Sequence, residues 1–216
     1  MFNSWQKLAL VLSKYEELNY FFLGGLGIRM RAASGRDGLL EKEDLRDHND
    51  IDIYVFDEQF IDFLKLFSKD EYDIWHTPIA GLNSHAVGEF HSVSLRDKEN
   101  DVDIGLFRAV AEGDGRLVTT NIRRVFHPGT IFNEPPVALN GMKLKIMSPE
   151  WLYYMSIFQS GEKRKDGQLI VGEVDFDKFN KMQLLAYETG SDAFSYFKFI
   201  TDFDVVLKNA DVLTHL

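Results

Sequence analysis

Two short acidic segments hold the residues whose types and spacing most suggest chemistry. Asp50 and Asp52 flank one isoleucine, and Asp101 and Asp103 flank one valine. Side chains alternate between the faces of a β-strand, so each pair of aspartates shares one face if its segment is extended. Adjacent carboxylates repel each other unless a cation lies between them, and magnesium prefers such oxygen ligands. The spacing therefore predicts a magnesium site built from these two segments.

If the two segments form neighbouring strands, one aspartate of the second segment joins Asp50 and Asp52. Asp101 and Asp103 share a face, so spacing alone leaves either of them as the third ligand. Three carboxylates can hold two ions, which would activate an attacking hydroxyl and stabilise a phosphate and its pyrophosphate leaving group. A solvated strand face is the alternative interpretation of each acidic pair taken alone.

A glycine pair, Gly24 and Gly25, follows the apolar run at residues 20–23. The run predicts a strand that enters a glycine turn, and residues 26–33 predict the next helix. Glycine lets the backbone approach a phosphate closely, and a helix N-terminus offers free N–H groups. Gly24 and Gly25 are therefore candidates for binding a triphosphate, although a purely structural turn fits the same residues.

The elements that must position these residues are predicted from hydrophobic periodicity and turn signals. In the first part of the chain we expect helices at 4–19, 26–33 and 58–68, strands at 20–23 and 50–56, and a polar loop at 34–49. Further strands are expected at 72–77, 89–95, 101–107, 116–126 with a break near Asn121, and 141–147. A helix is expected after Ser148, a good N-cap that Pro149 follows, and helical patterning resumes at 175–210.

This order of elements predicts an α+β protein in which a mixed sheet with flanking helices precedes a helical subdomain. We place a mixed-sheet catalytic domain at residues 1–147 and the helical subdomain at residues 148–216. The hydrophobic periodicity changes between them, because the short strand patterns end and helical patterns follow.

Composition narrows the class of protein. The chain has 216 residues, of which 45% are hydrophobic and 27% are charged, as in ordinary globular proteins. Its net charge of −10 disfavours binding to a nucleic-acid backbone. It has no cysteine, so disulfides and thiolate metal sites are excluded, and we expect a cytoplasmic location. No apolar run approaches the roughly 20 residues needed to cross a bilayer, so no membrane contact is expected. The oligomeric state stays open.

The order of strand, Gly-Gly, helix, Asp-x-Asp strand and later single-Asp strand resembles the polymerase-β-like nucleotidyltransferase superfamily. More narrowly, three segments resemble the lincosamide and aminoglycoside nucleotidyltransferases: LGGLGIRM at 23–30, LRDHNDIDIYV at 45–55 and NDVDIGLF at 100–107. The segment NGMKLKIMSPEWLYYMSIFQSGEKRKDGQL at 140–169 is similar to the one in which that family enters its helical half. In outline the resemblance covers about residues 20–170.

The resemblance implies a function. It implies magnesium-dependent transfer of a nucleoside monophosphate, AMP from ATP, to a hydroxyl of a small molecule such as an aminoglycoside or lincosamide antibiotic. It makes Asp50, Asp52 and Asp103 the ligands of two magnesium ions, with Asp103 also a candidate general base. The residues that would bind the nucleotide are Gly24, Gly25, Arg46, His48 and Lys165.

Some features depart from this family or fit other interpretations. Residues 34–45 look like an insertion, and Tyr-Tyr-Met stands where the family often has Leu-Lys. Arg46 and His48 could instead brace a turn, and the basic run that ends at Lys165 could be a solvated helix end. A toxin-type enzyme that modifies RNA or protein, or a nucleotide-binding module without catalysis, would use the same fold. The sequence does not identify the acceptor and leaves these alternatives open.

Overall fold

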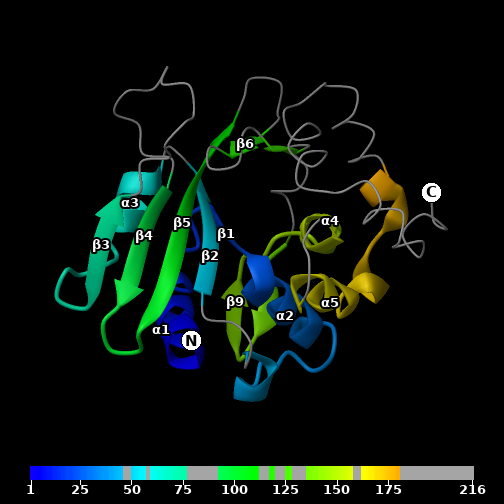
Figure 1. Ribbon diagram of the computed structural model, residues 1–216, viewed down its shortest axis with the longest axis horizontal. Helices are drawn as coiled ribbons and strands as arrows, with labels where there is room; N and C mark the ends of the chain where they lie inside the picture. Colours follow the sequence, from blue (N-terminus) through cyan, green and yellow to red (C-terminus); the bar gives the residue numbers. More distant parts are fainter. Residues whose placement is uncertain are drawn as a thin grey trace.

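The computed structural model describes residues 1–45, 50–56, 59–76, 92–111, 117–119, 125–127, 135–157 and 162–180. Within these residues a mixed β-sheet stands beside a group of helices (Figure 1). Strands and helices are interspersed along the first part of the chain, so the predicted α+β class is confirmed. None of the described helices is long and apolar enough to cross a membrane.

Seven of the described strands form one sheet, in which five follow the order β1-β2-β5-β4-β3 and β6 and β7 extend from β5. Its strands are Tyr20–Leu23 (β1), Asp50–Phe56 (β2), Tyr72–His76 (β3), Ser92–Asp97 (β4), Val102–Ala111 (β5), Leu117–Thr119 (β6) and Val125–His127 (β7). β2 and β5 are parallel, and the other pairs in this sheet are antiparallel. The strands that carry the two acidic segments are therefore direct neighbours.

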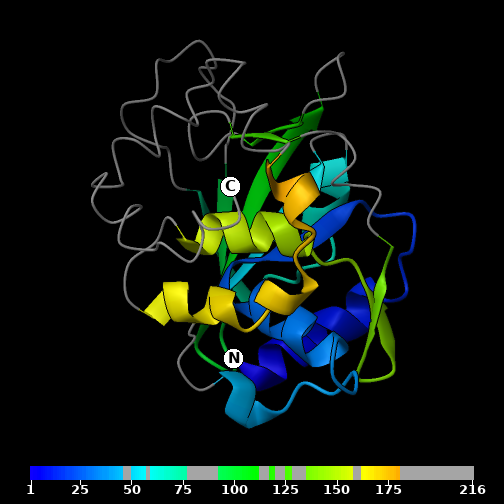
Figure 2. The same ribbon diagram turned by 90° about the vertical axis from the view of Figure 1, so that its right-hand side faces the viewer.

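The helices pack on this sheet and on one another. They span Phe2–Leu12 (α1), Gly24–Ser34 (α2), Phe60–Leu64 (α3), Pro149–Ile157 (α4) and Glu162–Gln168 (α5), with short 3₁₀ helices at Lys42–Leu45 (η1) and Val171–Glu173 (η4). α2 contacts β1 and β2 on one side and α4 and α5 on the other. Figure 2 shows these three helices in front of the sheet. α2 is thus the element that joins the sheet to the later helices.

The central strands bury one face of the sheet. Ile51, Ile53 and Val55 are fully buried, and Ile104 and Leu106 of β5, the register partners of the two isoleucines, continue the same apolar layer. Each such side chain contributes roughly 1.5–3 kcal/mol through burial. The residues between them, including Asp50 and Asp52, are on the opposite face by the two-residue period of a strand. The alternation predicted for β2 is confirmed.

Several element boundaries differ from the predicted ones. The first helix ends at Leu12 rather than at residue 19, and the N–H groups of Lys14 and Tyr15 then donate to carbonyls three residues back, as in turns. α3 is shorter than the predicted 58–68, and β5 is longer than the predicted 101–107. The expected N-cap is confirmed, since the Trp151 N–H donates to Ser148 Oγ at 3.2 Å. Some residues of the predicted elements lie outside the described residues, namely 46–49, 58, 77, 89–91, 116, 120–124 and 181–210.

The strand predicted at 141–147 is confirmed at residues 142–144 only, where it forms one half of a hairpin. Val137–Leu139 (β8) and Met142–Leu144 (β9) pair antiparallel. Asn140 and Gly141 join them with left-handed φ angles of 48° and 76°. Asn-Gly is the residue pair that a two-residue type I′ turn favours, since both of its positions need positive φ.

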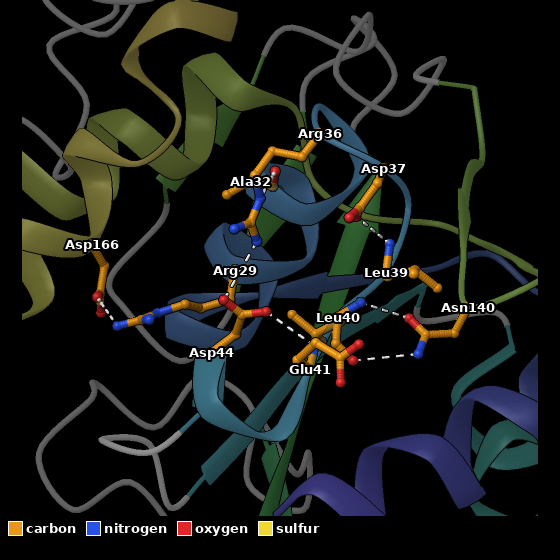
Figure 3. Close-up of polar contacts among 10 residues, drawn as sticks. All are labelled: Arg29, Ala32, Arg36, Asp37, Leu39, Leu40, Glu41, Asp44, Asn140 and Asp166. Atoms are coloured by element: carbon orange, nitrogen blue, oxygen red, sulfur yellow. Dashed lines mark hydrogen bonds and ion pairs between the residues drawn. The ribbon is translucent and has the colours of Figure 1, made fainter.

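Asn140 also fixes the segment that follows α2 (Figure 3). Its Oδ1 accepts the Leu40 N–H at 2.9 Å, and its Nδ2 donates to the Leu40 carbonyl at 3.3 Å. Its own N–H donates to the Gly38 carbonyl at 2.7 Å. Leu40 and Leu45 are both buried. The described part of the predicted loop is therefore docked on the β8–β9 hairpin and ends in a short 3₁₀ helix.

A short extended segment at residues 145–147 completes the outer side of β1. The Phe22 N–H donates to the Lys145 carbonyl, and the Phe22 carbonyl accepts the Met147 N–H, each at 3.0 Å. The buried Arg31 of α2 donates Nε to the Met147 carbonyl at 2.9 Å and Nη2 to the Ile146 carbonyl at 2.6 Å. β1 and α2 are therefore both tied to the chain just before α4.

Asp97 organises the turn between β4 and β5, and it is fully buried. Its Oδ1 accepts the N–H groups of Glu99 and Asn100 at 3.0 and 3.2 Å. Its Oδ2 accepts the Asn100 amide and the Ser4 hydroxyl, both at 2.8 Å. Burial raises the pKa of Asp97, but the hydrogen bonds from Asn100 and Ser4 outweigh burial and hold this pKa below its ordinary value. The carboxylate thus links the turn to α1.

This carboxylate makes stability depend on pH. Because the pKa of Asp97 is lower in the folded than in the unfolded chain, its contribution is full above the unfolded-state pKa of about 4. The contribution is lost as the pH falls through the folded-state pKa. We expect Asp97→Asn to lower the free energy of unfolding by about 1–3 kcal/mol near neutral pH and to flatten its decline below about pH 4. Urea unfolding across this range measures both effects, and unchanged stability near neutral pH would contradict them.

Candidate active site

The two acidic segments meet on one face of the sheet. β2 and β5 pair with Asp50 opposite Asp103 and Asp52 opposite Gly105. On the other side of β5, Arg96 of β4 is opposite Asp103. Neighbouring strands lie about 4.8 Å apart, so the Asp50 and Asp103 side chains start from adjacent backbone positions. Asp103, rather than Asp101, is the register partner of Asp50.

Asp52 lies between two glycines. A Cβ atom added to Gly24 would lie 2.5 Å from Asp52 Oδ2, and one added to Gly105 would lie 3.1 Å from Asp52 Oδ1. The first distance excludes a side chain unless something moves, and the second would be crowded. Gly24 also has a left-handed φ of 65°, which disfavours other residues. The Asp52 carboxylate therefore occupies space that glycine leaves open on both sides.

The glycine pair also starts a helix beside this carboxylate. Gly24 and Gly25 are the first two residues of α2, so their N–H groups have no acceptor within the helix. A helix N-terminus carries the positive end of the helix dipole, which favours anions such as phosphate groups. The acidic face and an anion-binding helix end are therefore adjacent at Gly24.

Arg96 clasps two aspartates of the second acidic segment. Its Nη1 donates to Asp103 Oδ1 at 3.0 Å, while its Nε and Nη2 contact Asp101 Oδ1 at 2.7 and 2.5 Å. Asp101 precedes β5 and has a left-handed φ of 56°. A hydrogen bond to Asp101, together with the charges of both aspartates, raises the pKa of Arg96 above its ordinary value. The guanidinium is therefore a fixed positive charge within this group of carboxylates.

The candidate ligands are carboxylate oxygens, the type of ligand that magnesium prefers. They belong to carboxylates on two adjacent strands, and the Asp52 carboxylate lies in the space that the missing side chains of Gly24 and Gly105 leave open. In the described part of the chain, no three acidic or histidine side chains already converge closely enough to hold a metal ion. Asp103 is instead bonded to Arg96. A metal ion bound by Asp103 would therefore compete with Arg96 for this carboxylate.

Of the three basic residues predicted to bind the nucleotide, the structure describes only Lys165. Lys165 is exposed on α5, and the adjacent Asp166 is buried. Asp166 Oδ1 accepts a hydrogen bond of 2.6 Å from Nη2 of Arg29 on α2 (Figure 3). This ion pair ties the helix that carries Lys165 to the helix that begins at the glycine pair. Arg46 and His48 lie outside the described residues.

Arg96 and Gly105 lie beside the candidate carboxylates but are not among the site residues predicted from the sequence. Gly105 had a usable signal, because glycine inside a strand pattern often marks the close approach of another group. Arg96 lies one residue beyond the predicted strand at 89–95, so the predicted alternation does not assign its side chain to a face of the sheet. β4 in fact runs to Asp97, which places Arg96 on the face that carries Asp103.

The fold is similar to that of nucleotidyltransferases of known structure. The lincosamide antibiotic adenylyltransferase LnuA, bound to lincomycin, matches 76% of this chain and 94% of its own chain, with a TM-score of 0.55 and 15% identity. The antibiotic-resistance factor ANT(2'')-Ia matches 92% of this chain and 99% of its own, with a TM-score of 0.53 and 13% identity. Its complex with adenylyl-2''-tobramycin matches 85% and 95%, with a TM-score of 0.52 and 11% identity. No family model matches, and no curated protein matches in sequence. The predicted resemblance is confirmed as a likeness of fold.

The space around Gly24 yields a prediction with a matched control. Gly24→Ala places a methyl group on Asp52 and strains a left-handed residue. Gly141→Ala has the same backbone problem at a φ of 76°, but nothing lies within 4 Å of its added Cβ. We expect both variants to lose about 1–2 kcal/mol of stability. Only Gly24→Ala should also lower magnesium-dependent nucleotide binding, by roughly tenfold or more. Thermal unfolding and nucleotide titration measure the two effects, and equal binding by both variants would contradict the contact with Asp52.

Proposed function

We propose that this chain is a magnesium-dependent nucleotidyltransferase that transfers a nucleoside monophosphate, with ATP as donor, to a hydroxyl of a small molecule. The observation that carries the proposal is the pairing of Asp50 with Asp103 beside Asp52 and the glycine-led helix. The nucleotidyltransferase fold supports the same class of reaction. A solvated strand face would not need Gly24 and Gly105 to make room for a carboxylate.

In the proposed reaction the acceptor oxygen forms a bond to the α-phosphorus of the nucleotide. The bond from that phosphorus to the oxygen bridging to the β-phosphate breaks, and pyrophosphate leaves. The acceptor hydroxyl gives its proton to a base, for which Asp103 is the candidate. Asp50, Asp52 and Asp103 would hold two magnesium ions, which neutralise charge on the α-phosphate and on the departing pyrophosphate.

The triphosphate would lie at the N-terminus of α2. The N–H groups of Gly24 and Gly25 would donate to phosphate oxygens there, since no helical carbonyl takes them up. Arg46 and His48 precede β2 in the sequence and are the further residues that we propose to contact the nucleotide. Lys165 would contribute from α5, which the Arg29–Asp166 pair fixes to α2.

The acceptor is proposed from two neighbouring structures. The LnuA structure contains lincomycin, and one ANT(2'')-Ia structure contains adenylyl-2''-tobramycin. We therefore propose a lincosamide or aminoglycoside antibiotic as acceptor. The chain's net charge of −10 favours a cationic acceptor. Residues 148–216, the proposed helical subdomain, would supply the acceptor pocket against the catalytic domain of residues 1–147.

A thermal-shift titration tests the donor half of this proposal. Each nucleoside triphosphate is added with and without magnesium to the wild-type protein and to Asp50→Asn. One nucleotide with magnesium should stabilise the wild type by about 2.7 kcal/mol at a concentration near 100 times its Kd, and this effect should vanish in the variant. If no nucleotide stabilises the wild type in the presence of magnesium, the proposal is overturned. If one nucleotide binds but no acceptor supports turnover, the fold serves as a binding module.

A further inference from the structure

Arg96 stands at the centre of a row of charged residues on the site face of the sheet. Across the strands the row runs from Asp73 through Arg96 and Asp103 to Asp50, as the register of β3, β4, β5 and β2 requires. Asp73 already has a cationic partner, because Lys98 Nζ lies 3.2 Å from its Oδ1. Arg96 is thus the cation that the described structure places between the outer strands and the two carboxylates at the centre of the site.

The contacts of Arg96 are divided unequally between its two partners. Asp101 takes two of its nitrogens, at 2.7 and 2.5 Å, whereas Asp103 takes one at 3.0 Å. Asp101 is held in place by the turn, since its N–H donates to the Asp97 carbonyl at 2.8 Å. Asp101 therefore anchors the guanidinium, and the contact with Asp103 is the weaker of the two.

We propose that Arg96 is a positioning residue that serves as the internal counter-cation of the site. Its guanidinium holds one oxygen of Asp103, and a divalent ion must compete with it for this carboxylate. Asp101 anchors Arg96 and so limits its hold on Asp103. This inference rests on the proposed function, because it takes Asp50, Asp52 and Asp103 as the ligands of the ion.

Charge arithmetic gives the direction of the effect. Asp50, Asp52, Asp101 and Asp103 carry a charge of −4, and Arg96 reduces it to −3. A guanidinium keeps its charge at any ordinary pH, so it cannot leave by losing a proton. At a separation of a few ångströms it repels a divalent ion. Its ion pair with Asp103 is exposed and therefore easily broken. Arg96 therefore weakens binding of a free ion and leaves the site dependent on an ion that arrives with a nucleotide.

Calorimetric titration with Mn²⁺ alone, without nucleotide, tests the inference on the intact protein. Arg96→Met should bind Mn²⁺ roughly 3- to 10-fold more tightly than the wild type, as expected for removal of one nearby positive charge. Arg96→Lys keeps the charge and should restore wild-type affinity. Arg36→Met is the matched control, because it removes an exposed arginine paired with Asp44 on another segment. Affinity of Arg96→Met equal to or weaker than that of the wild type would overturn the proposal.

The role of Asp101 is tested by a double-mutant cycle. Asp101→Asn frees Arg96 to bind Asp103 and should weaken Mn²⁺ binding by roughly 3- to 10-fold. In Arg96→Met/Asp101→Asn that effect should shrink markedly, because there is no guanidinium left to anchor. If the two substitutions instead act additively, Asp101 affects the ion only through its own charge, and the anchoring role is wrong.

Asp50→Asn separates failure of this inference from failure of the proposed function. If Mn²⁺ binding requires Asp50 but ignores Arg96, the site stands and the counter-cation role falls. If Mn²⁺ binds no variant, with or without ATP, both proposals fall. Circular dichroism and the unfolding temperature establish that each variant is folded, and Arg96→Gln, which removes the charge but keeps a polar side chain, replaces Arg96→Met if that variant does not fold.

Discussion

Asp52→Asn is expected to lower the rate of nucleotide transfer by roughly 10²- to 10⁴-fold while leaving the fold intact. Asparagine has nearly the same shape as aspartate, so it still fits between Gly24 and Gly105. It lacks the negative charge that would hold a magnesium ion beside the triphosphate. The loss should appear in turnover at saturating nucleotide as well as in nucleotide affinity, because the ion acts on the departing pyrophosphate.

The measurement is magnesium-dependent release of pyrophosphate in the presence of the acceptor found for the wild type. Asp62→Asn is a suitable control, because Asp62 is an exposed aspartate on α3 that pairs with Lys65. It should retain wild-type turnover. If Asp52→Asn also turns over at the wild-type rate, Asp52 is not a metal ligand and the proposed mechanism is wrong.

The second large effect concerns stability and the pair between α2 and α5. Arg29→Met should lower the free energy of unfolding by about 3–5 kcal/mol, the usual cost of removing one partner from a buried ion pair. The Asp166 side chain is only 5% exposed and Arg29 only 16% exposed, so water compensates little for the lost contact. The pair also spans 137 positions of the chain, so its loss loosens two distant elements.

Urea unfolding of three variants distinguishes this explanation from a general effect of losing charge. Arg29→Met/Asp166→Leu should recover most of the stability, because no buried carboxylate is left without its guanidinium. Lys65→Met removes an exposed ion pair and should change stability by less than about 1 kcal/mol. A loss in the double variant as large as in Arg29→Met would show that packing, rather than charge pairing, stabilises this contact.

The part of the fold that could be predicted from the sequence is the part governed by local patterns. Alternation of aspartate and aliphatic residues predicted β2, since a strand with one buried face has this period. Ser148 and the following proline predicted the start of α4. The first helix was predicted too long, because Tyr15 and Leu18 continue its apolar period beyond the turn at Ser13. Here the backbone turns after Ser13, with hydrogen bonds from Lys14 and Tyr15 to carbonyls three residues back, although the apolar period continues.

The candidate site was predictable in its main residues but not in its contacts. Strand alternation gave the face of Asp50 and Asp52, and resemblance to a family gave Asp103. Alternation alone does not determine which strands are neighbours, because strand pairing depends on contacts distant in sequence. For the same reason neither the clasp of Arg96 nor the pair of Arg29 with Asp166 could be predicted from the sequence pattern.

The segment at residues 145–147 affects the order in which the chain can fold during synthesis. Arg31 and its carbonyl partner Met147 are separated by 116 positions. At translation rates of about 5–20 residues per second, the ribosome needs roughly 6–23 s to add these residues. Over that interval β1 lacks its neighbouring segment at residues 145–147, and Arg31 of α2 lacks the Ile146 and Met147 carbonyls to which it donates. We therefore expect the apolar YFFL strand to need chaperone protection on the ribosome until Met147 emerges from the exit tunnel.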